Sequence, residues 1–96
     1  MYRREITPAG ERTLRKLEKE VRAALVETSR TLDQDPFGNG ERLHGPLKFL
    51  YSFHFKCNNV SYRAAYTIDV AKSIILIHYV GPRESFYDRL RRQLGV

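Results

Sequence analysis

A β-hairpin is predicted by the stretch YSFHFKCNNVSYRAAY, residues 51–66. On each side of Asn58-Asn59 the side chains alternate between two faces, as they do in a strand. Asparagine suits a two-residue turn because it tolerates positive φ angles. With the turn at these two residues, His54 lies directly opposite Arg63. Aromatic side chains then occupy one face of the hairpin, where helices can pack, and polar and basic side chains occupy the other.

Helices are expected before this hairpin, and a strand and a helix after it. Apolar residues recur at helical spacing after Thr7-Pro8, which is a typical helix start. The pattern slips near Leu17, which favours two helices or one bent helix. Asp35-Pro36 and the glycines that follow end the helical part. The predicted elements are a strand at 1–6, helices within 7–34, strands at 47–56, 58–70 and 73–80, and a helix at 84–94.

This order of elements predicts an α+β fold in which a small antiparallel sheet packs against N-terminal helices and a C-terminal helix, β-α(α)-β-β-β-α. The 96 residues, 42% of them hydrophobic, are enough for one domain, residues 1–96, with a modest core. A single cysteine, Cys57, excludes an internal disulfide framework and a cysteine-based metal site. No apolar run approaches the roughly 20 residues that cross a bilayer, and the charged N-terminus is unlike a signal peptide, so we expect a cytoplasmic protein.

Positive charge is concentrated in the second half of the chain. Residues 1–47 hold nine Lys and Arg against eight Asp and Glu, a net charge of +1. Residues 48–96 hold eight against three, a net charge of +5. A concentrated positive field favours a polyanionic partner, nucleic acid first, or a complementary acidic protein. The alternative is that the charge serves solubility alone.

The polar face of the hairpin carries the first candidate site residues. His54 and Lys56 on one strand lie close to Arg63 on the other, because cross-strand partners are only about 4.5–5.5 Å apart at Cβ. Ser52 and Lys48 extend this set as candidate substrate-binding residues. Cleavage of RNA by its own 2′-hydroxyl needs a base, cations for the anionic phosphorane and an acid for the leaving oxygen, which such side chains can supply. The alternative is a solvated sheet face on which these side chains are merely tolerated.

Two later residues can join this set. Arg83 follows the break at Gly81-Pro82, where the last predicted strand ends, and Tyr87 lies one helical turn farther on. A guanidinium and a phenol can therefore converge above the edge of the sheet. Alternatively, Tyr87 extends the apolar stripe of the last helix and Arg83 contacts only solvent. His44 and His78 are interpreted as structural residues.

Three motifs of the chain are Leu43-His44-Gly45, Tyr62-Arg63-Ala64-Ala65-Tyr66, and Val80-Gly81-Pro82-Arg83 with Tyr87. They resemble the motifs of the RelE branch of the RelE/ParE toxin superfamily. That family has Leu-x-Gly before the sheet, Tyr-Arg-x-x-Tyr on a strand, and Val-Gly-x-Arg at the end of the last strand with a tyrosine four residues later. The helical half fits as well, so the resemblance covers nearly the whole chain.

The resemblance implies the toxin of a type II toxin–antitoxin system. Such a toxin is an endoribonuclease that cuts mRNA in the ribosomal A site, without a metal ion or other cofactor, and leaves a cyclic phosphate. Arg63 and Arg83 would bind the scissile phosphate, and Tyr87 would stack on or orient the substrate nucleotide. The implied partners are a cognate antitoxin protein, in a toxin–antitoxin hetero-oligomer, together with mRNA and the small ribosomal subunit. No membrane partner is implied.

The chain departs from the family pattern at three positions. Members with well-understood chemistry carry lysines where this chain has Ser52 and His54, and many carry histidine where it has Pro82. Because of these departures, the motifs do not identify the general base. His54 is the first choice, and Lys56 and Tyr87 are the alternatives.

Two rival functions share these features. A ParE-like toxin of the sister branch has the same fold and inhibits DNA gyrase by binding it, without catalysis. A non-catalytic basic RNA-binding domain explains the charge of +6 equally well. The pairing of Tyr87 with Arg83, and the polar face around Arg63, favour the nuclease over both.

Overall fold

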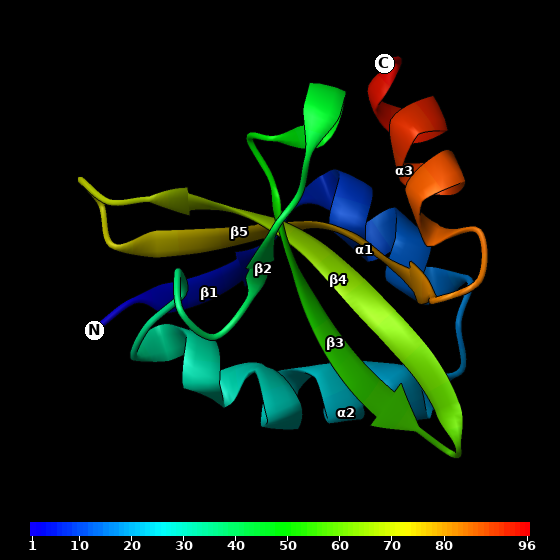
Figure 1. The fold of residues 1–96 in the computed structure, drawn as a ribbon. Helices are drawn as coiled ribbons and strands as arrows, with labels where there is room; N and C mark the ends of the chain where they lie inside the picture. The colour runs from blue at the N-terminus through cyan, green and yellow to red at the C-terminus, as the bar shows by residue number, and fades with distance from the viewer.

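The computed structural model describes residues 1–96 and contains one five-stranded sheet with helices on both faces (Figure 1). The observed order of elements confirms the predicted α+β class. Two short 3₁₀ segments, Ser29–Asp33 and Gly45–Leu47, complete the chain. The strands are β1 Arg3–Ile6, β2 Glu41–Arg42, β3 Tyr51–Cys57, β4 Val60–Asp69 and β5 Ile74–Pro82, and the helices are α1 Pro8–Arg15, α2 Lys19–Thr28 and α3 Phe86–Leu94.

The strands lie in the order β1-β5-β4-β3-β2. The β3–β4 and β4–β5 pairs are antiparallel, as expected. The short strand β2, which the sequence does not predict, pairs with β3 in antiparallel, and β1 pairs with β5 in parallel. The sheet is therefore mixed rather than wholly antiparallel. The sequence of β1 does not reveal this, because the direction of pairing depends on a partner about 70 residues away in the chain.

The hairpin of β3 and β4 has the predicted register. Asn58 and Asn59 form the turn with φ angles of 50° and 65°, and His54 is the direct partner of Arg63. β4 is the central strand of the sheet, and the register between β4 and β5 shifts at Ala65/Tyr66. Because Ala65 pairs with Tyr79 and Tyr66 with Ile77, His78 is the extra residue of a β-bulge.

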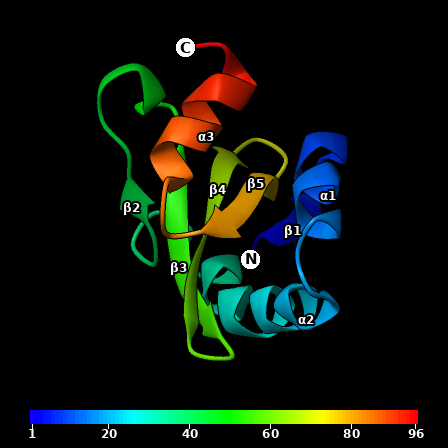
Figure 2. The same cartoon turned by 90° about the vertical axis from the view of Figure 1, so that its right-hand side faces the viewer.

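Hydrophobic side chains fill two separate layers, one on each face of the sheet. The helices α1 and α2 cover one face of the sheet, and α3 covers part of the other (Figure 2). The first layer contains Leu14, Val21, Leu25, Leu32, Phe55, Ala64, Tyr66, Ile75, Ile77 and Val80. The second contains Leu43, Leu47, Leu50, Ala65, Tyr79, Phe86 and Leu90.

The segment before β3 differs from its prediction. The strand expected from residue 47 begins only at Tyr51, because Gly45 adopts a φ of +62° and the chain continues as a 3₁₀ turn. Phe49, which alternation places among the core aromatics, is consequently 53% exposed. Leu47 and Leu50 point inward instead, under α3.

The helix α1 begins where the sequence predicts, and the helical part of the chain ends before Asp35-Pro36 with the 3₁₀ segment Ser29–Asp33. Thr7 caps α1 through a hydrogen bond that its side chain accepts from the Gly10 amide, and Pro8 occupies the first turn. The break near Leu17 separates α1 from α2. None of the helices has the length and apolar character that crossing a membrane requires.

Candidate active site

The candidate site occupies the part of the sheet that α3 leaves uncovered. Phe86 and Leu90 of α3 pack over Ala65 and Tyr79 on that face. Two residues away along each strand, the direct partners His54, Arg63 and Gly81 form a row across β3, β4 and β5. Because cross-strand partners point to the same face, the side chains of His54 and Arg63 stand side by side in this uncovered region.

Gly81 keeps this row open. A Cβ atom at this position would lie 3.2 Å from the ring of Tyr79, which is closer than most carbon contacts in folded proteins. A larger side chain would also stand directly beside Arg63, its partner on β4. Glycine therefore leaves room both for the Tyr79 ring and for the guanidinium of Arg63.

The uncovered region forms an open pocket of about 370 Å³. His54, Lys56, Arg63 and Arg83, four of the predicted site residues, line it together with Ser61 and two aromatic residues. No carboxylate lines this pocket. An accumulation of cations without a compensating acid favours an anionic ligand such as a phosphate group.

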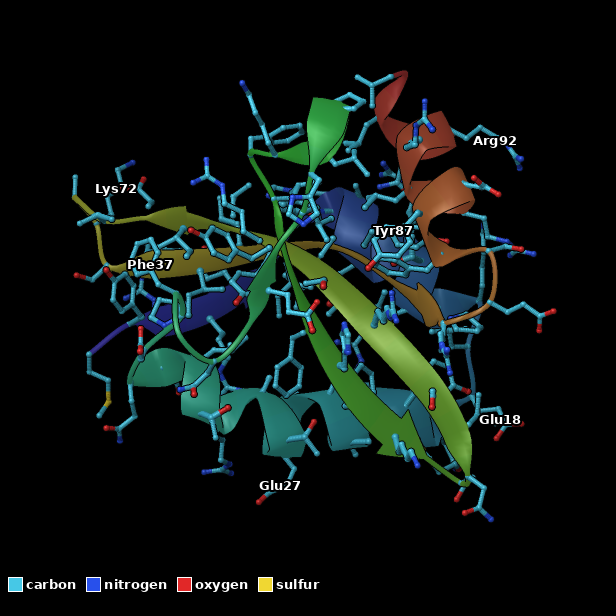
Figure 3. All side chains as sticks on the ribbon, in the orientation of Figure 1. Glu18, Glu27, Phe37, Lys72, Tyr87 and Arg92 are labelled. Atoms are coloured by element: carbon cyan, nitrogen blue, oxygen red, sulfur yellow. The ribbon has the colours of Figure 1, made fainter.

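Arg63 connects the sheet to α3. Its Nη1 donates a hydrogen bond of 2.6 Å to the Tyr87 hydroxyl, and its Cζ lies 5.1 Å from the centroid of the Tyr87 ring. Figure 3 shows Tyr87 between α3 and the sheet, whereas Glu18 and Glu27 lie toward α2. Because the phenol oxygen accepts this bond, its own proton remains free to be donated to a ligand.

The backbone around the end of β5 positions Arg83. Its amide donates a 2.8 Å hydrogen bond to the Ser61 carbonyl, which continues the ladder with β4 by one residue. Ser85 then adopts a φ of 60°, a left-handed conformation that is uncommon for serine, just before α3 begins. This sharp turn brings Tyr87 back over Arg63.

Two of the predicted substrate-binding residues do not line the pocket. Ser52 is 1% exposed, so its hydroxyl does not reach the surface; it lies 3.4 Å from His54 Nε2 and can orient that ring. Lys48 is exposed in the segment before β3, where its carbonyl accepts a hydrogen bond from Arg42.

The remaining histidines differ from each other. His78 is half-buried and forms a 2.8 Å hydrogen bond with the Thr67 hydroxyl, as expected of a structural residue. Burial lowers its pKa, because the charged imidazolium is poorly solvated there. His44 is exposed and lies in a second pocket beside Tyr87. Sequence reasoning missed this placement, since only the position of the segment before β3 relative to α3 reveals it.

Together these groups can bind a phosphodiester and assist proton transfer. Two guanidiniums and an ammonium can stabilise negative charge on phosphate oxygens, while an imidazole and a phenol can exchange protons. His54 and Lys56 come from β3, Arg63 from β4 and Tyr87 from α3, while Arg83 follows the end of β5 and is held there by its backbone hydrogen bond to Ser61.

Comparisons with known proteins agree with this fold. The family model of the ParE-like toxin of type II bacterial toxin–antitoxin systems matches residues 5–91. No curated protein sequence matches the chain. The structure of the toxin–antitoxin complex RelBE2 from Mycobacterium tuberculosis contains a chain that is 29% identical, with a TM-score of 0.72, and the match covers 85% of this chain and 98% of that one.

Two further solved structures share the fold at lower sequence identity. A mutant of the E. coli toxin RelE in the free state is 21% identical, with a TM-score of 0.71, and 99% of this chain and 97% of that one are covered. The archaeal RelE–RelB complex from Pyrococcus horikoshii gives 22% identity and a TM-score of 0.59, over 86% and 96% of the two chains. The chain belongs to the ParE-like toxin family of type II bacterial toxin–antitoxin systems, in the RelE branch of the RelE/ParE superfamily.

Proposed function

We propose that the protein is an endoribonuclease that cleaves mRNA in the ribosomal A site. The observation that carries this proposal is the pocket in which Arg63 and Arg83 lie with His54 and Lys56, and in which no carboxylate is present. A second feature supports it: the Tyr87 hydroxyl is held by Arg63 at 2.6 Å, next to the place where a phosphate would bind.

The proposed reaction is attack of the 2′-hydroxyl on the adjacent phosphate. A base removes the proton of the 2′-hydroxyl, and the 2′-oxygen forms a bond to phosphorus while the bond from phosphorus to the 5′-oxygen breaks. An acid gives a proton to that 5′-oxygen. The products are a 2′,3′-cyclic phosphate and a 5′-hydroxyl end, and no oxidant, reductant or second substrate is needed.

Four residues that line the pocket, and Tyr87 beside it, have proposed roles in this reaction. Arg63 and Arg83 hold the scissile phosphate and stabilise the charge of the phosphorane. His54 is the proposed base, since a neutral imidazole accepts protons near physiological pH and Ser52 can orient its ring. Lys56 adds positive charge, and Tyr87, whose phenol proton is free, is the proposed acid.

The proposed partners follow from the family and from this chemistry. A cognate antitoxin would hold the toxin inactive in a hetero-oligomer, and the small ribosomal subunit would present the mRNA. The proposed place of action is therefore the cytoplasm, where translating ribosomes are found.

The test is cleavage of a defined mRNA on programmed ribosomes, mapped by primer extension. Wild-type protein should cut at the A-site codon, and Arg83→Ala should slow the cut by roughly 10²- to 10³-fold, as is typical when one group that stabilises a developing anion is removed. Arg30→Ala, an exposed arginine on the opposite side of the sheet, is the matched control and should cut at the wild-type rate.

Intact mRNA in the presence of wild-type protein that arrests growth would refute the nuclease. A gyrase supercoiling assay would then test the ParE-like alternative, in which the toxin binds gyrase without catalysis. Equal cleavage rates in wild type and Arg83→Ala would refute the proposed site but not the activity.

A further inference from the structure

A second pocket adjoins the candidate active site through Tyr87. It has a volume of about 290 Å³ and lies between α3 and residues 41–47, where Tyr87 and Arg91 face His44 and Pro46. Tyr87 and Arg91 are four residues apart on α3, so their side chains lie on the same face of the helix. The hydroxyl of Tyr87 thus contacts Arg63 in the first pocket while its side chain lines the second.

The wall formed by residues 41–47 is firmly held. Leu43 and Leu47 are buried in the hydrophobic layer under α3. The Leu43 amide donates to the Leu50 carbonyl at 2.9 Å, and the Leu47 amide donates to the His44 carbonyl at 3.2 Å. This segment is therefore fixed relative to α3, and the pocket does not depend on a ligand for its shape.

The groups in this pocket suit a flat, partly polar ligand. The phenol of Tyr87, the imidazole of His44, the ring of Pro46 and the guanidinium of Arg91 all offer flat or compact faces on which a planar ring can stack. Arg42 and Arg91 supply two positive charges against the single carboxylate of Glu41. This balance favours a ligand that carries phosphate groups next to a planar ring.

We propose that this second pocket binds the base of a nucleotide that flanks the scissile phosphate, with His44 and Arg91 as specificity-determining residues. The proposal rests on the function proposed above, because the phosphate must lie at Arg63 for a neighbouring base to reach the other side of Tyr87. Tyr87 then separates the reacting phosphate from the base that is recognised. His44 and Arg91 do not contact the reacting atoms.

The experiment measures binding of fluorescently labelled protein to ribosomes programmed with an mRNA that cannot be cleaved. The A-site codon carries 2′-O-methyl sugars, and the base on either side of the expected cut is removed in turn by an abasic nucleotide. Stacking on aromatic side chains typically gives about a fivefold to hundredfold change in affinity per base, so wild-type protein should lose affinity by about this factor at one of the two positions.

The variants separate this pocket from its surroundings. In His44→Ala and Arg91→Ala, removal of that base should lower the affinity for the ribosome by a factor at least five times smaller than in wild type, because the side chains that hold the base are gone. In His44→Phe, removal of the base should lower the affinity as much as in wild type, since phenylalanine also offers a flat ring. Arg92→Ala is the matched control and should behave as wild type. Arg92 is the next residue on α3, but it lies away from Tyr87 (Figure 3) and lines a different pocket.

The outcomes distinguish the two proposals. If wild type cleaves ordinary mRNA but base removal has no effect, or has the same effect in all variants, the second pocket binds no base. If wild type shows the loss of affinity without cleaving ordinary mRNA, the base site stands and the nuclease fails. If the protein does not bind programmed ribosomes at all, both are refuted.

Discussion

Replacement of Tyr87 by phenylalanine tests how the phenol acts. The substitution keeps the ring but removes the oxygen that accepts the 2.6 Å hydrogen bond from Arg63. A hydrogen bond to a charged group contributes about 1.5–3 kcal/mol when it is protected from water. Tyr87 is 37% exposed, so water can replace part of this bond, and about 1 kcal/mol is the appropriate magnitude.

The two possible roles of the hydroxyl predict different rates. If it only positions Arg63, a loss of about 1 kcal/mol slows cleavage roughly fivefold. If it also gives the proton to the leaving 5′-oxygen, the loss of an acid slows cleavage by roughly 10²- to 10⁴-fold. We expect the larger effect, because the phenol accepts its bond from Arg63 and keeps its proton for the substrate.

The assay is single-turnover cleavage of mRNA on programmed ribosomes with the toxin in excess, so that the measured rate is that of the chemical step. Tyr51→Phe is the control, because Tyr51 is a tyrosine on the face of the sheet that α1 and α2 cover. A Tyr87→Phe rate within twofold of wild type would refute both roles. A substrate with a 5′-thio leaving group needs little protonation, so if the phenol is the acid, Tyr87→Phe should slow its cleavage only by the roughly fivefold factor that comes from positioning Arg63.

Two further predictions concern the stability of the fold. Tyr66→Phe removes a buried hydroxyl that donates a 2.6 Å bond to the Pro36 carbonyl, so the free energy of unfolding in urea should fall by about 1–3 kcal/mol; an unchanged value would show that this carbonyl finds another partner. Burial lowers the pKa of His78, so the unfolded chain binds more protons than the folded chain below about pH 6.5, and the free energy of unfolding should decrease as the pH falls through this range. His78→Gln should lack this part of the pH dependence, and parallel curves for the two proteins would contradict the assignment.

The sequence predicts the hairpin well because its signals are local. Alternation of side chains fixes which face each residue of β3 and β4 occupies, and the turn at Asn58-Asn59 then fixes the register. His54 and Arg63 are therefore placed correctly as partners. The parallel pairing of β1 is not predictable in this way, because it depends on contacts with residues far along the chain.

Alternation gives a wrong prediction for residues 47–50, which have the alternating pattern of a strand but lie outside β3. Phe49 has the spacing of a core aromatic, yet Gly45 and the 3₁₀ turn that follows rotate the chain before β3 begins. Leu47 and Leu50 take the buried positions because α3 offers them an apolar surface. Whether Phe49 or the two leucines are buried depends on the position of α3, and the sequence of residues 47–50 alone does not reveal that position.

The position of α3 also determines which residues of the polar face can meet a substrate. Phe86 must point to the sheet, since it is buried against Tyr79, and its neighbour Tyr87 then points about 100° away around the helix. That direction brings its hydroxyl to Arg63. The helix α3 therefore covers the part of this face around Ala65 and Tyr79 and also places Tyr87 against Arg63, beside the pocket. A change that shifts α3 along the sheet should consequently alter the hydrophobic layer and the candidate site together.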